Sequence, residues 1–236
     1  MKTIGIVGGL GPEASLYYYR TLIDLAHEAQ SPETPYPEIE MVIYNLNQNE
    51  SAAKLFKAGR WADHAAKLLY AIERLYRAGA DFAIIACNTA HTVFDEVKAK
   101  SPIPLLSIVE ETCKAVERLG LVKVGLFGSP DTMRGYFYPD VFSKRNISVV
   151  VPKGEDQDYI GRKSREELAL GVIRDETRQG FLEVAQRMID EESIQGLILG
   201  CTEIPLLLGK EKFVIPFFDT SKIHVESAFR YSLLEA

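Results

Sequence analysis

Residues 84–91 read Ile-Ile-Ala-Cys-Asn-Thr-Ala-His, and residues 198–204 read Ile-Leu-Gly-Cys-Thr-Glu-Ile. Each stretch is an apolar run typical of a buried strand, and each run ends on a cysteine, Cys87 or Cys201, that small polar residues follow. A cysteine between a strand and the N-terminus of a helix is exposed, and the helix dipole favours its thiolate. Two such stretches about half a chain apart predict a duplicated architecture with one thiol in each half.

A second pair of similar segments supports the duplication. Residues 123–129, Lys-Val-Gly-Leu-Phe-Gly-Ser, echo residues 3–9, Thr-Ile-Gly-Ile-Val-Gly-Gly, at an offset of 120, and the two cysteines are 114 residues apart. Each half therefore has a strand with a glycine turn early and a strand with a cysteine late. Strands that alternate with helices form parallel sheets, so we expect an α/β protein with two lobes, each a parallel sheet flanked by helices.

Hydrophobic periodicity and turn residues place the other elements. The expected strands cover 3–8, 39–45, 82–87, 104–108, the repeat at 123–129, 147–151, 196–200 and 213–217. The expected helices cover 12–29, a long stretch ending near Gly79, the stretch before Ser143, 155–170, 176–192 and the chain from about Ser221. In the first helix, Leu16, Tyr19, Ile23 and Ala26 are expected to form the buried face.

Composition and charge narrow the class of protein. The chain has 236 residues, 47% of them hydrophobic and 25% charged, which is ordinary for a globular protein with a sizeable core. A net charge of -6 argues against a nucleic-acid-binding surface. No apolar run reaches the roughly 18 residues of a membrane helix, and the N-terminal run is too short for a signal sequence. The three cysteines lack zinc-ligand spacing, and the expected compartment is the reducing cytoplasm.

The expected ligand site lies beyond the carboxyl ends of the strands, as is usual in parallel α/β sheets. The turn at Gly8 and Gly9, Ser129, Cys87 and Cys201 all stand at such ends. If the lobes pack face to face, both thiols point into one cleft between them. The glycine turn only partly matches a dinucleotide fingerprint, because no acid ends the second strand. It is better suited to presenting amide N–H groups to a substrate carboxylate.

Three further residues with reactive or titratable side chains have different expected roles. Cys113 lies in a helical run with no strand before it, so packing is its expected role. His91 follows Cys87 by four residues; it either polarises the site or binds a carboxylate, or it is structural. His224 is expected to be structural.

Cys-Asn-Thr at 87–89 and Gly-Cys-Thr-Glu at 200–203 resemble the paired signatures of the aspartate/glutamate racemase superfamily, and the opening Gly-Gly-Leu-Gly-Pro-Glu-Ala resembles its aspartate racemase branch. The resemblance covers essentially the whole chain. It implies two pseudosymmetric lobes, the first of residues 1–105 plus 212–236 and the second of residues 106–211. It also implies an active site between the lobes, a homodimer, and racemisation with no pyridoxal phosphate, metal or nucleotide.

The resemblance also assigns the site residues. Cys87 and Cys201 become the two acid/base groups. The groups that bind the small amino-acid substrate are Gly9, Leu10, Asn88, Thr89, Ser129, Thr132, Thr202 and Glu203. No nucleic acid and no membrane is expected as a partner.

The sequence departs from the aspartate racemase branch where that branch grips the side-chain carboxylate. The expected arginine and lysine fall near Ala52 and Ala169, with Lys54, Lys57, Arg162 and Lys163 as substitutes nearby. Two predictions of the substrate therefore remain open. The substrate is aspartate or glutamate, or the enzyme accepts a broad range of amino acids. Other activities of the superfamily stay open, namely hydantoin racemase, maleate isomerase and arylmalonate decarboxylase, as does a non-catalytic amino-acid binder.

Overall fold

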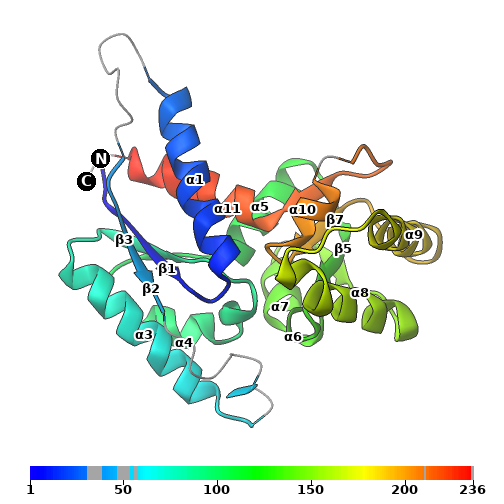
Figure 1. The fold of residues 1–236 in the computed structure, drawn as a ribbon, viewed down its shortest axis with the longest axis horizontal. Helices are drawn as coiled ribbons and strands as arrows, with labels where there is room; N and C mark the ends of the chain where they lie inside the picture. The colour runs from blue at the N-terminus through cyan, green and yellow to red at the C-terminus, as the bar shows by residue number, and fades with distance from the viewer. Residues whose placement is uncertain (31–38, 47–53, 56–57, 210, 235–236) are drawn as a thin grey trace. The chain divides into compact units, whose positions relative to one another are not determined.

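The structure is a computed structural model, and it describes residues 1–30, 39–46, 54–55, 58–209 and 211–234. The chain divides into two compact units (Figure 1). Unit 1 comprises Met1–Ile108 and Ser221–Ala236, and unit 2 comprises Val109–Thr220. The chain therefore passes from one unit to the other at residues 108 and 220, where the sequence suggested 105 and 211.

Unit 1 is built on a four-stranded parallel sheet with the strand order β2-β1-β3-β4. Its strands are β1 (Ile4–Gly8), β2 (Met41–Asn45), β3 (Phe82–Ile85) and β4 (Leu105–Leu106). Its helices are α1 (Pro12–Glu28), α3 (Trp61–Arg77), the 3-10 helix η1 (Thr89–Val93), α4 (Phe94–Lys100) and α11 (Thr220–Ser232). The first residue of α11, Thr220, is the last residue of unit 2.

The two central strands of unit 1, β1 and β3, are buried on both faces, which explains why they are apolar, whereas the edge strand β2 is partly exposed and ends on Asn45. Ile4 and Ile6 point to one face and pack with apolar side chains of α1 and α11. Val7 points to the other face and packs with side chains of α3 and α4. Figure 1 shows these two pairs of helices on opposite sides of the sheet. Side chains alternate along a strand, so a sheet covered by helices on both faces requires apolar residues at every position.

Unit 2 repeats this plan with the order β6-β5-β7-β8, again all parallel. Its strands are β5 (Lys123–Gly128), β6 (Ser148–Val150), β7 (Leu197–Gly200) and β8 (Phe217–Asp219). Its helices are α5 (Ile108–Arg118), α6 (Pro130–Arg134), α7 (Phe137–Ser143), α8 (Gly154–Glu166), the 3-10 helix η2 (Leu168–Leu170), α9 (Asp175–Glu192) and α10 (Ile204–Leu208). The predicted fold class, two parallel sheets flanked by helices, is confirmed.

The last strand differs from its predicted position. We expected a strand at 213–217 and placed residues from 212 onward in the first lobe, whereas β8 starts at Phe217 and pairs with β7 in unit 2. Its central residue, Phe218, is paired in register with Ile198 and is buried. The fourth strand of the second sheet thus comes from the C-terminal part of the chain, and only α11 returns to unit 1.

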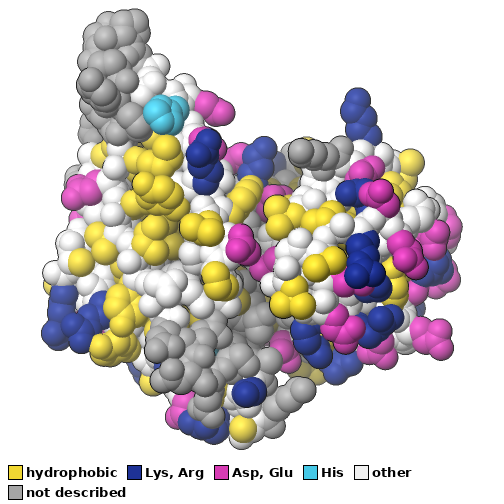
Figure 2. Space-filling view, viewed as in Figure 1, with side chains coloured by type: hydrophobic (Ala, Val, Ile, Leu, Met, Phe, Trp, Pro, Cys, Tyr) yellow, Lys and Arg dark blue, Asp and Glu magenta, His cyan; other side chains and the backbone are white. Residues whose placement is uncertain are grey.

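Of the four residues predicted for the buried face of α1, only Ala26 is buried, and Ile23 is partly exposed. The buried residues of this helix are Ala14, Tyr18, Leu22 and Ala26, spaced four apart, whereas Leu16 and Tyr19 are 63% and 48% exposed. The helix carries apolar residues on more than one face, so hydrophobic periodicity alone did not identify the face that is buried. The buried face includes Tyr18, whose hydroxyl forms a long-range hydrogen bond of 2.9 Å with His224 of α11. Figure 2 shows hydrophobic side chains gathered on the surface over α1.

The long helices of the two units are amphipathic. Helices α1 and α3 have 17 residues each and α9 has 18, and each buries one stripe of side chains. Helix α3 ends at Arg77, close to the predicted end, and Gly79 follows with φ of 93°, a left-handed conformation that glycine adopts without strain. Within the described ranges, no helix combines the length and the apolar character needed to cross a membrane.

Candidate active site

Cys87 and Cys201 follow equivalent strands of the two sheets. Cys87 lies just after β3, where its N–H donates to the Ile85 carbonyl at 2.8 Å, and Cys201 lies just after β7. Neither cysteine forms a disulfide, and both are partly exposed. Strands β3 and β7 hold the same place in the two strand orders, so each cysteine stands at the carboxyl end of the corresponding strand.

A helical segment follows each cysteine. Cys87 precedes the five-residue 3-10 helix η1, and Cys201 precedes the five-residue helix α10. The 3-10 helix η1 continues directly into α4, so the helical stretch after Cys87 runs from Thr89 to Lys100, whereas the helix after Cys201 ends at Leu208.

His91 is structural, which resolves one of the open alternatives. Its Nδ1 lies 2.9 Å from the carbonyl oxygen of Cys87, and its Nε2 lies 3.2 Å from the backbone N–H of Ile108. Since the carbonyl only accepts and the N–H only donates, the ring is neutral with its proton on Nδ1. Burial, followed by the neighbouring His224, lowers the pKa of His91 to about 3. The ring thus ties the backbone of Cys87 to the start of α5.

His224 is also structural, as predicted. Its Nε2 is 3.1 Å from the carbonyl oxygen of Leu106, so it donates there, and its Nδ1 accepts from the hydroxyl of Tyr18. Burial lowers the pKa of His224 to about 4. This bridge fixes α11 and α1 to the end of β4, one strand away from Cys87.

Unit 2 has a matching buried tyrosine. Tyr138 follows Tyr18 at the repeat offset of 120 and, like it, is fully buried. Its hydroxyl hydrogen-bonds to the side chains of Thr112 on α5 and of Thr220, the first residue of α11. Burial raises the pKa of Tyr138, so it stays a neutral phenol. The duplication therefore extends from the sheets to the buried polar contacts beneath them.

The glycine turn after β1 has a clear steric reason. Gly9 has φ of 79°, and a Cβ there would lie 2.6 Å from the backbone oxygen of Leu46. Its N–H donates to the hydroxyl of Ser15 at 2.9 Å. The amide that the sequence suggested for a substrate carboxylate is thus used within unit 1. Leu10 is partly buried and packs on the core beside α3.

Ser129 and Thr132 cap the first turn of α6. The Ser129 hydroxyl accepts from the Thr132 N–H at 3.2 Å and lies 3.0 Å from the Thr132 hydroxyl. Thr132 is fully buried, and its methyl group packs close to Gly128 and Gly200 at the ends of β5 and β7. Of these two hydroxyl side chains, only Ser129 is partly exposed.

The remaining motif residues lie beside the cysteines in their own units. Thr89 and Thr202 are partly exposed, whereas Asn88 is buried. Glu203 is partly exposed, and one of its carboxylate oxygens lies 2.9 Å from the sulfur of Cys201. Sequence reasoning missed this contact. The signal was present, because the residue two positions after the cysteine is charged in the second half and is Thr89 in the first.

The cationic residues suggested as partners of a substrate's side-chain carboxylate have different surroundings. Ala169 is exposed in η2. Lys163 forms an ion pair with Glu167, which also accepts from the hydroxyl of Thr177. The guanidinium of Arg162 stacks over a tyrosine ring of the same helix. Ala52 and Lys57 lie outside the described residues, and Lys54 is exposed.

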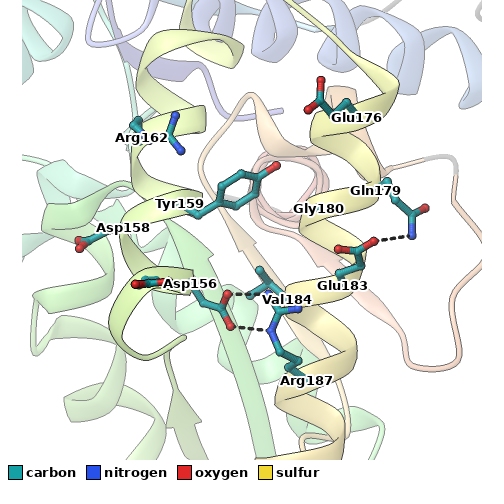
Figure 3. A pocket seen from close by; sticks show the side chains of 11 residues that line it. Asp156, Asp158, Tyr159, Arg162, Glu176, Gln179, Gly180, Glu183, Val184 and Arg187 are labelled. Atoms are coloured by element: carbon teal, nitrogen blue, oxygen red, sulfur yellow. Dashed lines mark hydrogen bonds and ion pairs between the residues drawn. The ribbon is translucent and has the colours of Figure 1, made fainter.

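A surface cavity of about 610 Å³ lies between α8 and α9 (Figure 3). None of its eleven lining residues belongs to the cysteine motifs. Figure 3 shows Tyr159 projecting across it and Arg187 paired with Asp156, and Figure 2 shows charges of both signs over these helices. The cavity is a charged groove within unit 2, separate from the strand ends that carry the thiols.

Cys113 has the packing role predicted for it. It is fully buried in α5, and burial raises the pKa of its thiol to about 11. Among the described residues, no group of three or more His, Cys, Asp or Glu side chains is arranged to hold a metal ion.

Two α/β units of equal strand order, each with a partly exposed cysteine after the same strand, define a duplicated α/β protein with paired thiols. The chain belongs to the Asp/Glu/hydantoin racemase family, whose model matches residues 7–228. This confirms the resemblance seen in the cysteine motifs.

The comparisons with individual proteins agree with this family. The fold is similar to that of a putative Asp/Glu racemase from Yersinia pestis, with a TM-score of 0.88 and 31% identity over 99% of this chain and 100% of that one. It is similar to an aspartate racemase homologue from Pyrococcus horikoshii OT3, with a TM-score of 0.81 and 33% identity over 98% and 99%. The broad specificity amino-acid racemase RacX of Bacillus subtilis is 27% identical over 226 residues, 92% of each chain.

Proposed function

We propose that the protein is a cofactor-independent amino-acid racemase in which Cys87 and Cys201 are the two acid/base groups. The observation that carries this proposal is the repeated placement of a partly exposed thiol after the corresponding strand of two sheets with the same order. Membership in the racemase family supports it. The proposal requires that both thiols reach one substrate from opposite faces.

The chemistry needs two such groups. The thiolate of one cysteine removes the proton from Cα, and the electron pair left behind is delocalised into the substrate carboxylate. The thiol of the other cysteine then gives its proton to the opposite face of Cα, which inverts the centre. Free thiols titrate at about 8.5, so at neutral pH one cysteine must be activated and the other kept protonated.

Polar groups beside the thiols are proposed to hold the ammonium and carboxylate groups of the substrate. In unit 1 they are Asn88 and Thr89, and in unit 2 they are Ser129 and Thr202. Hydrogen bonds to the carboxylate become stronger as negative charge builds on it, so they stabilise the transition state more than the bound substrate.

Aspartate and glutamate are the first substrates to consider, since the family and two of the similar structures carry these names. A broader range has specific support. Ala169 offers no cation, and Lys163 is paired with Glu167. The similarity to a broad specificity racemase points the same way. We therefore propose an amino-acid racemase that accepts acidic side chains but does not depend on a fixed cation to select them.

The reaction is tested by incubating the protein in D2O with single amino acids and following the α-proton by NMR. Loss of the α-proton signal together with formation of the other enantiomer identifies both reaction and substrate. A product with an isomerised double bond or released CO2 would instead assign another activity of the superfamily. Binding without any exchange, in wild type and in cysteine variants alike, would make the protein an amino-acid binder.

Selectivity is tested by comparing kcat/KM for aspartate, glutamate, homoserine and a neutral aliphatic amino acid. Selection by size alone gives roughly 10–200-fold, whereas a site that pairs a buried charge can reject a ligand lacking it by about 10⁴-fold or more. Values within about 100-fold of one another support the broad range. A preference for aspartate above about 10⁴-fold would show that a cation does grip the side chain.

A further inference from the structure

The carboxylate of Glu203 and the thiol of Cys201 form a pair that has no charged counterpart two positions after the other cysteine. The Sγ–Oε2 distance is 2.9 Å, with the thiol as donor. A thiolate and a carboxylate this close would repel each other strongly. The contact therefore needs a proton between the two atoms, and with an ionised carboxylate that proton is on sulfur.

The local backbone holds the two side chains together. Ile204 is fully buried, and its N–H donates to the carbonyl of Cys201 at 3.1 Å. Glu203 is the N-cap residue of α10, yet its side chain makes no capping hydrogen bond. Here the carboxylate lies against the sulfur instead.

The first half of the chain differs at this position. Cys87 and Cys201 are related by an offset of 114, and the residue related to Glu203 is Thr89, which carries no charge. His91 does not replace the carboxylate, because both of its ring nitrogens are engaged with backbone groups. The two cysteine motifs therefore differ in charge at this position.

We infer that Glu203 is a positioning residue that keeps the proton on Cys201, so that Cys201 starts the cycle as the thiol and Cys87 as the thiolate. The inference rests on the proposed two-cysteine reaction. In one turnover Cys87 takes the Cα proton and Cys201 gives its own to the opposite face. This leaves a Cys87 thiol and a Cys201 thiolate beside the ionised Glu203, which is the less stable arrangement. The reverse reaction starts from that arrangement, or from one in which Glu203 has taken up the proton.

Thiol labelling tests this without any need for turnover. The three cysteines lie on three different tryptic peptides, so mass spectrometry can follow iodoacetamide labelling of each one at a fixed neutral pH. Only the thiolate reacts, and Cys201 is expected to react more slowly than Cys87. The isosteric change Glu203→Gln removes the negative charge. It should accelerate labelling of Cys201 by roughly tenfold or more and leave Cys87 within about twofold.

Two further variants make the test specific. Glu166→Gln removes an exposed carboxylate from α8 of the same unit and should change neither labelling rate. Thr89→Glu introduces a carboxylate at the related position of unit 1 and should slow labelling of Cys87. Ultraviolet absorbance of the thiolate gives a second readout of the same populations. Unchanged Cys201 labelling in Glu203→Gln, or equal acceleration of both cysteines, overturns the inference.

Exchange of the α-proton links the pair to the reaction. With Cys87→Ala, only Cys201 can remove a proton, and adding Glu203→Gln should raise the exchange rate of the remaining enantiomer in D2O. With Cys201→Ala, adding Glu203→Gln should leave exchange by Cys87 unchanged. Equal effects in both backgrounds would mean that Glu203 acts only on the fold. If no amino acid exchanges at all, the racemase proposal fails, and the labelling experiment still decides the role of Glu203.

Discussion

Acid should destabilise unit 1 in particular, because every histidine of the chain belongs to it. The four histidines are His27, His64, His91 and His224, and the ranges of unit 1 contain all of them. His27 is exposed, and the other three are buried. Unit 2 has no group of this kind, so the two units should differ in their response to mildly acidic pH.

The direction follows from the pKa values. Burial lowers the pKa of His91 to about 3 and that of His224 to about 4, from about 6.5 in an unfolded chain. As the pH falls below 6.5, the unfolded state takes up protons that the folded state refuses. The stabilisation is therefore complete above about pH 6.5 and decreases as the pH falls toward 4 and below.

The size of the effect is large for a single domain. At about pH 5 each of these two rings lies about 1.5 pH units below its unfolded pKa, and one unit corresponds to about 1.4 kcal/mol. Each ring then costs about 2 kcal/mol, and the pair about 4 kcal/mol. Burial, with Lys67 as a smaller cause, lowers the pKa of His64 to about 4, so it acts in the same direction. Domain stabilities are typically about 5–15 kcal/mol.

The measurement is urea unfolding at about pH 7.5 and about pH 5, followed by fluorescence of Trp61. Trp61 is the single tryptophan of the chain and belongs to unit 1, so its signal reports on that unit. The decisive variant is His224→Gln, whose amide can donate to the Leu106 carbonyl and accept from Tyr18 but cannot titrate. Between the two pH values it should lose about 2 kcal/mol less stability than wild type.

His27→Gln is the matched control, since it removes an exposed imidazole from the same unit. It should lose the same stability on acidification as wild type. Carboxylates also titrate in this range, but they are present in all three proteins and cancel in the comparison. An equal loss in His224→Gln and wild type would refute the reasoning that burial of a neutral imidazole makes unit 1 sensitive to acid.

Two further predictions concern the thiols and the glycine turn. Cys87→Ala and Cys201→Ala should each lower kcat by about 10²–10⁴-fold, whereas Cys113→Ala should keep kcat and lower only the melting temperature; full racemisation by either of the first two would exclude the two-base scheme. Gly9→Ala should cost more unfolding free energy than Gly79→Ala, because both have positive φ but only Gly9 has backbone 2.6 Å from the added Cβ. The Gly79 change should cost about 1 kcal/mol, and equal costs would show that the turn relaxes around the methyl group.

The sequence predicted the sheets well because the relevant signal is local. Each central strand is an apolar run ending in a glycine or cysteine turn, and the offsets of 120 and 114 related the two halves. The inner face of α1 was not predictable in this way. Leu16, Tyr18 and Tyr19 are all apolar enough to be buried, and the partner of the buried Tyr18 is His224, which is 206 residues away.

In the candidate site, too, the sequence predicted what depends on local pattern and did not predict long-range contacts. The positions of Cys87 and Cys201 after their strands follow from strand length and residue type. The partners of the site groups do not, since a hydroxyl or carboxylate can turn to several neighbours. The Gly9 amide is engaged by Ser15, and Thr132 is buried behind Ser129. Such choices are settled by packing among residues that the sequence alone does not bring together.

A reaction that inverts a carbon centre makes two opposed demands on a duplicated fold. The two bases must approach from equivalent positions, and the common strand order and the buried pair Tyr18 and Tyr138 supply equivalent scaffolds for them. The two thiols must also differ in protonation whenever substrate binds, because two thiolates cannot return a proton and two thiols cannot remove one. A carboxylate two positions after one cysteine and a threonine two positions after the other would meet that demand without changing the backbone, and Glu203 against Thr89 is a difference of this kind. A two-cysteine racemase thus requires two equivalent scaffolds whose cysteines have different neighbouring side chains.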